Sequence, residues 1–459
     1  SADAADIVIT GAPITYAQSD VTPQMIERQA TIASVNTVIS ELPGVFVSEA
    51  DAFGSADWVT NITIRGFSTN DGHVGTTIDG LPNGGSGYGG GSKANRYLDV
   101  QNLQTVAVSQ GTAGIASRTN ESLGGTLDYQ TSDPKQDRRY RFSLAGGDFG
   151  GRKIYARIDT GEIAPGTFAW ISASTSHVKD WVAQSDTTSR DHVAAKLTSD
   201  LGKVNLSGYV SFDDANEGEY GSVSLTNFKQ NPDFDGLTAN WTGIPYIDQN
   251  FRSGSRALRK NLFGYLRANA DLGEVKLVAS AYGHKMSGRG DWLPPYLVDI
   301  TNDGAGNPNS EFNRSGTVFG GSTGNKIFFV TPTGATAPTI AGCVPAAGIP
   351  ADYAPNCHDA NATPVMSYRH THYKNRRLGA VLDVNWEHDF GAFQNLLRAG
   401  LWYENGKSNV VRDWHKVTDA RVSYQFDAVP YYVQYDRDYG INELVYYADN
   451  SVTFGDLTA

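Results

Sequence analysis

Few residues in this sequence combine the types and the spacing that chemistry at a site requires. His370 and His372 stand two positions apart, so a β-strand would place both imidazoles on one face, where they could bind a metal ion. The plainer interpretation is that both histidines simply lie where a loop meets a strand and bind no metal. The segment 213–219 (DDANEGE) offers carboxylate oxygens, but it lacks the spacing of a calcium-binding loop and is expected to be a solvated loop. We therefore predict no metal site.

The other groupings that could do chemistry are weaker. Residues 85–90 (GSGYGG) match the letters of a dinucleotide-binding fingerprint, but they do not lead from a strand into a helix, and no acidic residue follows at the required place. No Ser/His/Asp or Cys/His grouping stands out either. We therefore predict that the chain is not an enzyme and needs no cofactor.

The chain has two cysteines, Cys343 and Cys357, in a stretch rich in Pro, Gly and Ala. We predict one disulfide that pins a long loop in an oxidising compartment. Two separate thiols are the alternative. A cysteine-based zinc site fails on both spacing and number of ligands, although His358 is the next residue.

Charge and hydropathy exclude further classes. Lys and Arg number 37 against 49 Asp and Glu, a net charge of −12, whereas a nucleic-acid-binding protein would show a basic stripe. No stretch comes near the ~20 apolar residues of a membrane helix. A transmembrane β-barrel has weak hydropathy, because only alternate residues face lipid. The first residues lack the basic and apolar regions of a signal peptide, so we expect any such peptide to have been removed.

The chain before about residue 133 has the pattern of a small mixed domain. Thr22 and Pro23 form an N-cap and a first helical residue. Apolar residues from Val35 to Leu42 then recur at helical spacing until Pro43. A charged, non-periodic hinge at 133–139 marks the domain boundary. Short strands are expected at 45–47, 62–64, 76–78, 103–109 and 125–129.

After the hinge, apolar and polar residues alternate, as in 204–212, 262–270 and 378–386. Many of these runs reach ~9–11 residues, the length of a tilted membrane strand, whereas strands of soluble sheets have ~5–6. Eight aromatic residues near predicted strand ends are expected to lie at the membrane interface. They are Trp292, Tyr296, Tyr368, Tyr373, Trp386, Trp402, Tyr403 and Trp414.

The connections between these strands alternate in length. The turns at 200–203, 271–274 and 389–392 are short, whereas the loops at 213–258 and 288–373 are long. Short turns on one side and long loops on the other are typical of outer-membrane β-barrels. A soluble β-protein has no reason to segregate its loops in this way.

A series of motifs then carries a resemblance to a known family. The chain contains Pro43-Gly44-Val45, Ile64-Arg65-Gly66-Phe67 and Asp79-Gly80-Leu81-Pro82, followed by the segments 98–112 (LDVQNLQTVAVSQGT) and 123–127 (LGGTL). In this combination and order they resemble the plug of TonB-dependent outer-membrane receptors. The resemblance rests on sequence motifs in the plug, whereas in the rest of the chain it rests only on the alternating pattern of the strands. Gly111-Thr112-Ala113 departs from the family's Gly-Pro-Ala, and 117–121 replaces its Leu-Tyr-Gly, which suggests a subfamily.

The resemblance implies the fold, the location and the partners. We expect a mainly β chain: part of a transmembrane antiparallel β-barrel (134–459), with an N-terminal α+β plug domain (13–133) inside the lumen and a TonB-box segment (1–12) before it. Such a protein lies in the bacterial outer membrane. Its partners would be TonB, outer-membrane lipid and lipopolysaccharide, and a small-molecule or oligomeric solute, with no nucleic acid.

The resemblance also implies site residues. Asp6, Ile7, Val8, Ile9 and Thr10 resemble a TonB box, a β-prone segment that could add to a sheet edge of the partner; a frayed terminus or a plug edge strand is the alternative. Arg65, Gly66, Asp79 and Gly80 would be structural, with the two charges satisfied by each other or by barrel carboxylates. The apical plug loops would present substrate-binding residues: Glu49, Asp51, Trp58, Asn70, Asp71, His73, Tyr88, Lys93, Arg96 and Tyr97.

About ten strands can be counted after residue 134, whereas plugged outer-membrane transporters have about 22. An open sheet edge cannot persist in lipid, so we expect a second chain or a missing segment to complete the barrel. The function expected is TonB-dependent active import of a scarce bulky solute, a siderophore or an organic nutrient. A passive porin or a surface adhesin with a vestigial plug is the alternative from another class.

Overall fold

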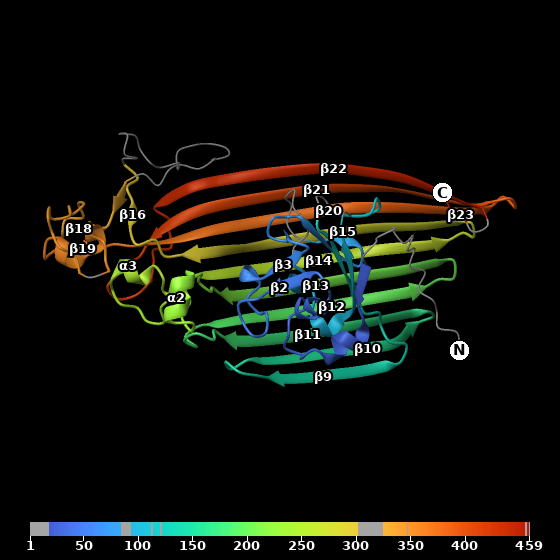
Figure 1. The fold of residues 1–459 in the computed structure, drawn as a ribbon, viewed down its shortest axis with the longest axis horizontal. Coiled ribbons are helices and arrows are strands. Elements are labelled where there is room, and N and C mark those ends of the chain that lie inside the picture. The colour runs from blue at the N-terminus through green and yellow to red at the C-terminus, as the bar shows by residue number, and fades with distance from the viewer. Residues whose placement is uncertain are drawn as a thin grey trace.

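The computed structural model describes residues 18–83, 93–111, 113–119, 122–301, 325–346, 348–454 and 457–458. An N-terminal domain of short strands and helical turns lies against one face of a large sheet of long strands (Figure 1). The mainly β architecture with a plug on a partial antiparallel barrel, as predicted, is confirmed.

The large sheet has eleven strands in the order β23-β22-β21-β20-β15-β14-β13-β12-β11-β10-β9. Its pairs are antiparallel throughout, and strand length grows from 9 residues in β9 to 23 in β22. The strands are β9 (Arg138–Gly146), β10 (Arg152–Ala164), β11 (Thr167–Lys179), β12 (Thr187–Asp200), β13 (Val204–Gly218), β14 (Arg256–Asp271), β15 (Val275–Trp292), β20 (Ser367–Asp389), β21 (Gln394–Lys416), β22 (Tyr432–Phe454) and β23 (Leu457–Thr458).

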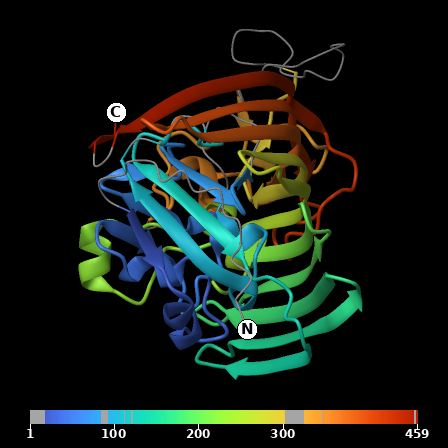
Figure 2. The same cartoon turned by 90° about the vertical axis from the view of Figure 1, so that its right-hand side faces the viewer.

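The sheet has two different faces because side chains alternate along each strand. Leu262 and Leu266 on β14 are exposed, Leu266 to 72%, whereas Phe263 and Tyr265 between them are buried. The sheet curves around the N-terminal domain, which covers its concave inner face (Figure 2). The outer face therefore carries the apolar band that a lipid-facing wall requires.

All the long loops leave one end of the sheet, here called the loop end (Figure 1). Among the described residues no helix is long and apolar enough to span a membrane. Cys343 and Cys357 form a disulfide within one loop. The loops contain α2 (Leu225–Gln230), α3 (Pro245–Asp248), β16 (Leu297–Val298), β17 (Lys326–Ile327), β18 (Phe329–Val330), β19 (Thr363–Pro364) and the 3₁₀ turns 252–254, 351–353 and 355–357.

The N-terminal domain, the plug, contains two small sheets. The first has the order β1-β7-β8-β5-β6 and the second the order β2-β3-β4. The strands are β1 (Gln18–Val21), β2 (Val45–Ser48), β3 (Asn61–Ile64), β4 (Phe67–Ser68), β5 (Val74–Ile78), β6 (Leu81–Pro82), β7 (Leu103–Gln110) and β8 (Gly125–Thr131).

The helical parts of the plug are short. The helix α1 (Pro23–Arg28) begins as predicted, with the Thr22 side chain accepting a hydrogen bond from the Met25 N–H and Pro23 in the first turn. The helical spacing from Val35 to Leu42 corresponds to a 3₁₀ turn, 37–41, which buries Val38 and Ile39. Further 3₁₀ turns lie at 57–59, 94–96 and 100–102.

The expectations for the acidic segment and for the two plug charges are wrong. Residues 213–218 belong to β13 and not to a solvated loop, because their acidic side chains find basic partners on neighbouring strands. Arg65 and Asp79 do not pair with each other or with barrel carboxylates. Arg65 is exposed and donates to Gln110 Oε1 at 3.0 Å. Asp79 instead accepts hydrogen bonds from the Thr131 N–H and hydroxyl and from Tyr265 of the wall, at 2.7–2.8 Å.

Candidate functional site

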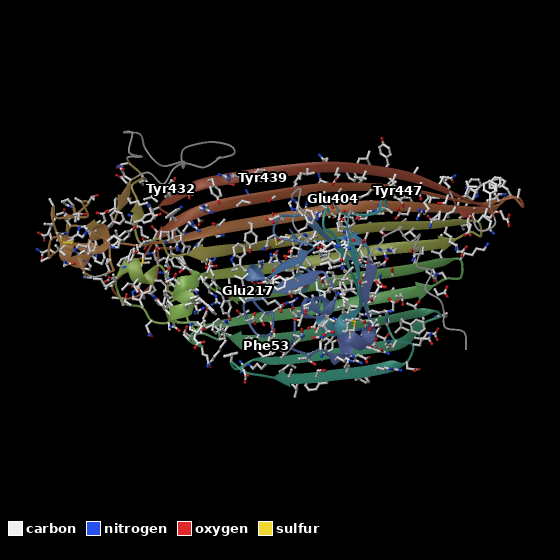
Figure 3. All side chains as sticks on the ribbon, viewed as in Figure 1. Phe53, Glu217, Glu404, Tyr432, Tyr439 and Tyr447 are labelled. Carbon is white, nitrogen blue, oxygen red and sulfur yellow. A yellow bond between two sulfur atoms is a disulfide. The ribbon has the colours of Figure 1, made fainter. Side chains whose placement is uncertain are left out.

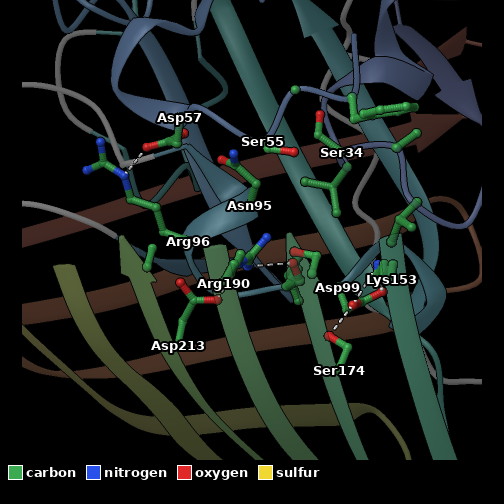
Figure 4. A pocket seen from close by; sticks show the side chains of 18 of the residues that line it. Ser34, Ser55, Asp57, Asn95, Arg96, Asp99, Lys153, Ser174, Arg190 and Asp213 are labelled. Carbon is green, nitrogen blue, oxygen red and sulfur yellow. Dashed lines mark hydrogen bonds and ion pairs between the residues drawn. The ribbon is translucent and has the colours of Figure 1, made fainter. Parts of the chain in front are cut away.

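The plug meets strands β10–β14 through buried charged side chains (Figure 4). Asp57 of the plug accepts a hydrogen bond from Arg96 Nε at 2.5 Å and lies 3.4 Å from Arg259 of β14. Arg259 also pairs with Glu217 of β13, whose carboxylate accepts the Trp58 backbone N–H at 2.8 Å. Asp57, Arg259 and Glu217 are all at most 3% exposed. We call these contacts, with those of Asp99 below, the plug–wall interface.

Asp99 is the second centre of the plug–wall interface. Its carboxylate lies 2.8 Å from Lys153 Nζ of β10 and accepts the Ser174 hydroxyl of β11 at 2.7 Å. Burial alone would raise the pKa of Asp99, but the Lys153 ammonium, His192 and several hydrogen bonds outweigh it, so the pKa lies below its ordinary value. The pKa of Asp57 is likewise lowered, since Arg96, Lys93 and Arg259 outweigh its burial. Both carboxylates therefore stay charged and bind the plug to the wall.

The space left at the plug–wall interface is small. A cavity of about 40 Å³ lies between the two parts, lined by charged side chains that include Asp57, Arg96, Lys153 and Arg190. A buried water needs about 10–15 Å³, so this space holds roughly three waters. A bulky solute cannot pass along this part of the wall unless the plug moves.

Plug contacts continue along the rest of the wall. Arg118 of the plug pairs with Asp383 of β20, which also accepts the Tyr447 hydroxyl of β22 at 3.0 Å. Arg377 of β20 donates to the Asn83 carbonyl at 3.2 Å and to Glu404 of β21 at 2.8 Å. Figure 3 shows Glu404 and Tyr447 well away from the loop end. These contacts identify which side chains of β20–β22 face the plug.

The same inner face continues past the plug toward the loop end. Side chains eight or ten residues from Arg377, Glu404 and Tyr447 share their face, because the period of a strand is two. Arg369, Arg412 and Arg437 stand at these positions, and each lies over an aromatic ring. Arg369 is 4.6 Å from the centroid of Trp292, while Arg412 and Arg437 are 4.9 and 4.1 Å from that of Tyr435. We call these residues the arginine wall.

The arginine wall has positive charge to offer. Within the described part of the chain, no ion pair with a carboxylate involves Arg369 or Arg412, and the buried Nε of Arg369 forms no hydrogen bond. Aromatic rings attract cations but do not neutralise them. An anionic solute that also presents a flat apolar surface would fit such a set of groups.

The residues expected in the apical plug loops fall into two groups, those exposed to solvent and those held by contacts within the protein. Trp58, Asn70 and Asp71 are exposed and His73 is partly exposed. The others are held by the protein itself. Asp51 accepts the Ser55 and Ala56 N–H groups, and Lys93 donates to the Asp57 carbonyl. Asp6, Ile7, Val8, Ile9, Thr10 and Tyr88 lie outside the described residues.

Three more of the expected residues have partners of their own. Glu49 accepts the Ser34 and Thr37 hydroxyls, Arg96 pairs with Asp57, and the Tyr97 hydroxyl bonds His284 of β15 at 2.9 Å. Burial raises the pKa of Glu49 and lowers that of Lys93. Contact between a solute and these residues would require the plug to shift, and it stays a prediction. The apical role of Trp58, Asn70, Asp71 and His73 also stays a prediction.

Sequence reasoning missed the arginine wall. Trp292, Tyr296 and Trp414 were expected at the membrane interface, yet Trp292 and Trp414 contact Arg369, and Tyr296 packs on Trp414. Trp402 is also buried, at 2% exposure. Arg369 and Trp292 stand directly opposite each other in the sheet register. The sequence shows both residues, but the register that pairs them cannot be read from either strand alone.

Comparisons with known proteins support this architecture. Residues 12–126 match the family described as TonB-dependent Receptor Plug Domain. Similar solved structures include BauA, the ferric preacinetobactin receptor from Acinetobacter baumannii, with a TM-score of 0.60 and 10% identity over 96% of this chain and 55% of that one. The ferric-catecholate import receptor Fiu from E. coli, in its closed form, has a TM-score of 0.60 and 12% identity over 97% and 55%.

The ferripyoverdine receptor of Pseudomonas aeruginosa has a TM-score of 0.56 and 14% identity over 97% of this chain and 54% of that one. Among curated protein sequences no significant match is found. At such low sequence identities, the structural similarity shows only that this chain shares the fold of these receptors. The chain spans a little more than half the length of the receptors it matches.

Proposed function

We propose that this chain, whose residues 12–126 match the plug domain of TonB-dependent receptors and whose fold resembles such receptors, acts in the TonB-dependent uptake of an anionic solute across the bacterial outer membrane. The observation that carries the proposal is the plug–wall interface. Buried ion pairs bind the plug to the inner face, and the cavity between them holds only a few waters. Uptake along this wall then needs work to displace the plug.

The partner that supplies this work would be TonB. Residues 6–10 (DIVIT) are β-prone and could add as a strand to an exposed sheet edge of the partner, where main-chain hydrogen bonds would grip the segment. A pull on this segment would reach β1, which pairs with β7 of the plug. The exposed Trp58, Asn70 and Asp71 would then meet the solute before the plug moves.

The arginine wall supports an anionic and partly aromatic solute. Arg369 and Arg412, which form no carboxylate ion pair among the described residues, could each donate charge-assisted hydrogen bonds, worth about 1.5–3 kcal/mol apiece. Trp292 and Tyr435 offer ring faces beside them. A ferric siderophore combines negative charge with planar groups, so we place it before a neutral organic nutrient as the solute.

Two features of the sheet concern its surroundings. Lipid cannot satisfy the backbone of the edge strands β9 and β23, so further strands, from this polypeptide or a second chain, would complete the barrel. On the outer face, Lys285, Arg376 and Lys407 stand in one register row with the exposed Leu262, and Lys374 lies one row nearer the loop end. Lipopolysaccharide phosphates would fit these basic groups above the apolar band.

The test is uptake by cells that carry the protein in their outer membrane. Val8→Pro removes a main-chain donor and blocks strand addition, and Ala2→Pro, outside the segment, is the matched control. We expect Val8→Pro to abolish uptake of radioiron from a ferric siderophore and to leave surface binding unchanged. Unchanged uptake in Val8→Pro would contradict the proposal.

The alternative functions predict other results. A passive porin with a vestigial plug would conduct ions in a planar bilayer with the plug in place, whereas we expect no steady conductance. A surface adhesin would neither bind nor import the iron complex. These measurements separate the three classes without knowledge of the natural solute.

A further inference from the structure

A compact group of imidazoles and one carboxylate lies on the outer face of the wall at the loop end. His370 and His372 of β20 share a face, and Asp413 and His415 of β21 share the same face, because each pair is two residues apart. This face is opposite to the arginine wall, since Arg369 and Arg412 are the neighbouring residues in the chain. The group is therefore off the route proposed for the solute and independent of the proposed function.

The distances within the group fit ligands that share one ion. Asp413 Oδ2 lies 3.1 Å from His372 Nε2, while Asp413 Oδ1 lies 3.7 Å from His370 Nδ1 and 3.6 Å from His415 Nε2. The ligand atoms of His370, His372 and Asp413 all lie within 4.8 Å of one another. Ligands about 2.1 Å from a tetrahedral Zn²⁺ lie roughly 3.4 Å apart. Two of the three distances are too long for hydrogen bonds but suit a shared ion.

His372 Nε2 is hydrogen-bonded to the Asp413 carboxylate, whereas the neutral form of His415 directs a lone pair toward it. His415 Nδ1 bonds the Asp427 carbonyl at 2.7 Å, and only a ring N–H can donate to a carbonyl. In the neutral ring, Nε2 then carries a lone pair that faces the Asp413 carboxylate. A lone pair and a carboxylate repel each other unless a proton or a metal ion lies between them. A backbone acceptor on the far ring nitrogen is also the usual support of a metal-bound histidine.

The surroundings favour a metal ion over a proton at this place. His370 is 2% exposed, and its Nε2 has no hydrogen-bond partner among the described residues. Burial disfavours a charged imidazolium, whereas a metal ion binds the neutral ring. The nearest competing cation, Arg289, is paired with Asp291 at 3.0 Å. The side chain of His372 is 35% exposed, so an ion can enter from solvent.

We propose that His370, His372 and Asp413 bind a divalent transition-metal ion of the Zn²⁺ type, with His415 as a fourth ligand after a small shift. Two or three imidazoles and one carboxylate suit Zn²⁺ and not Ca²⁺, which prefers oxygen ligands. The ion would join the ends of β20 and β21 to the loop 417–431, which already contacts His370 and His415 through Phe426. The site is therefore structural and fixes this loop above the wall.

The experiment is Zn²⁺ binding to the purified, detergent-solubilised protein without a histidine tag, measured by calorimetry after treatment with a chelator. We expect one Zn²⁺ per chain in the wild type and at least a hundredfold weaker binding in His372→Gln. His388→Gln, at the opposite end of the same strand and hydrogen-bonded to Glu274, should bind Zn²⁺ as the wild type does. Equal affinity in all three proteins would overturn the proposal.

A second readout keeps the test decisive if His372→Gln folds poorly. Asp413→Asn keeps the size of the side chain and removes the charge, and Co²⁺ reports tetrahedral coordination by its visible absorption. We expect Co²⁺ to colour the wild type and not Asp413→Asn, and Zn²⁺ to slow protease cleavage in the loop 417–431 of the wild type alone. A colourless wild type, or cleavage that Zn²⁺ does not slow, means that protons alone hold the group together.

Discussion

The plug–wall interface and the arginine wall contain the same kinds of side chain in opposite states. At the interface two buried cations of the wall have carboxylates, since Lys153 pairs with Asp99 and Arg259 with Glu217. On the arginine wall, Arg369 and Arg412 lie over Trp292 and Tyr435 and form no carboxylate pair within the described residues. The difference indicates that paired charges hold the plug, whereas unpaired ones are available to a ligand. Buried position alone does not make a charged residue a binding residue.

The largest effect is expected from breaking a pair at the plug–wall interface. Asp57→Asn would leave the partly buried Arg96 without its carboxylate and Arg259 with Glu217 alone, and breaking such a buried pair costs about 3–5 kcal/mol. Protease accessibility of the plug in urea, measured in isolated outer membranes, should shift to lower urea. Asp71→Asn, an exposed carboxylate of the same domain, is the control. Equal stability of the two variants would show that the pairs do not hold the plug.

Substitutions in the arginine wall should reduce solute binding and leave plug stability unchanged. Replacing Arg369 and Arg412 together by Gln should weaken binding of an anionic ferric siderophore about tenfold to a hundredfold for each charge, while the plug keeps its urea resistance. Arg376→Gln, on the outer face of the same strand and exposed, should change neither property. Loss of plug stability without loss of siderophore affinity would show that these arginines hold the structure together and do not bind the solute.

Acid should loosen the interface through Asp99. Its pKa in the folded protein lies below the unfolded value of about 3.9, so its contribution is complete above that pH and is lost as the pH falls through the folded value. Burial raises the pKa of Glu49, so the contribution of Glu49 to plug stability changes in the opposite direction, and it decreases as the pH rises. The wild type should therefore lose more plug stability between pH 5 and pH 3 than Asp99→Asn, in the same urea assay. Parallel pH profiles would remove Asp99 from the account.

The smallest effect is expected from the disulfide, which belongs to neither region. Replacing Cys343 and Cys357 by Ser removes a link that closes a short loop, worth about 3 kcal/mol in the chain-entropy view, but only to that loop. Protease should cut this loop faster, while plug stability and siderophore affinity stay at wild-type values. A fall in affinity would extend the solute site to the loop.

Local signals in the sequence predicted the elements well. Thr22 and Pro23 start α1 as expected, and the alternating segments form the long strands of the sheet. These features depend on neighbours in the chain. The acidic segment of β13 was misread because its partners, Arg190 and Arg259, lie on other strands.

The site could be predicted only in part for the same reason. Lys93, Arg96 and Tyr97 are polar residues after a glycine-rich loop, yet they are held by Asp57 and His284, 36 to 187 residues away. The arginine wall needs three strands in register before its members meet. The division of the chain at residue 133 and the roles of residues 6–10 stay predictions.

The central claim is that the solute enters only when the plug leaves the wall. Asn102 of the plug bonds Ser172 of β11 at 2.8 Å, so cysteines at these two positions can be joined by a short, cleavable thiol cross-linker. In cells carrying this variant without the native disulfide, we expect the cross-link to stop siderophore uptake, leave siderophore binding intact, and release uptake when it is cleaved. Uptake at the wild-type rate with the plug still joined to the wall would contradict the account.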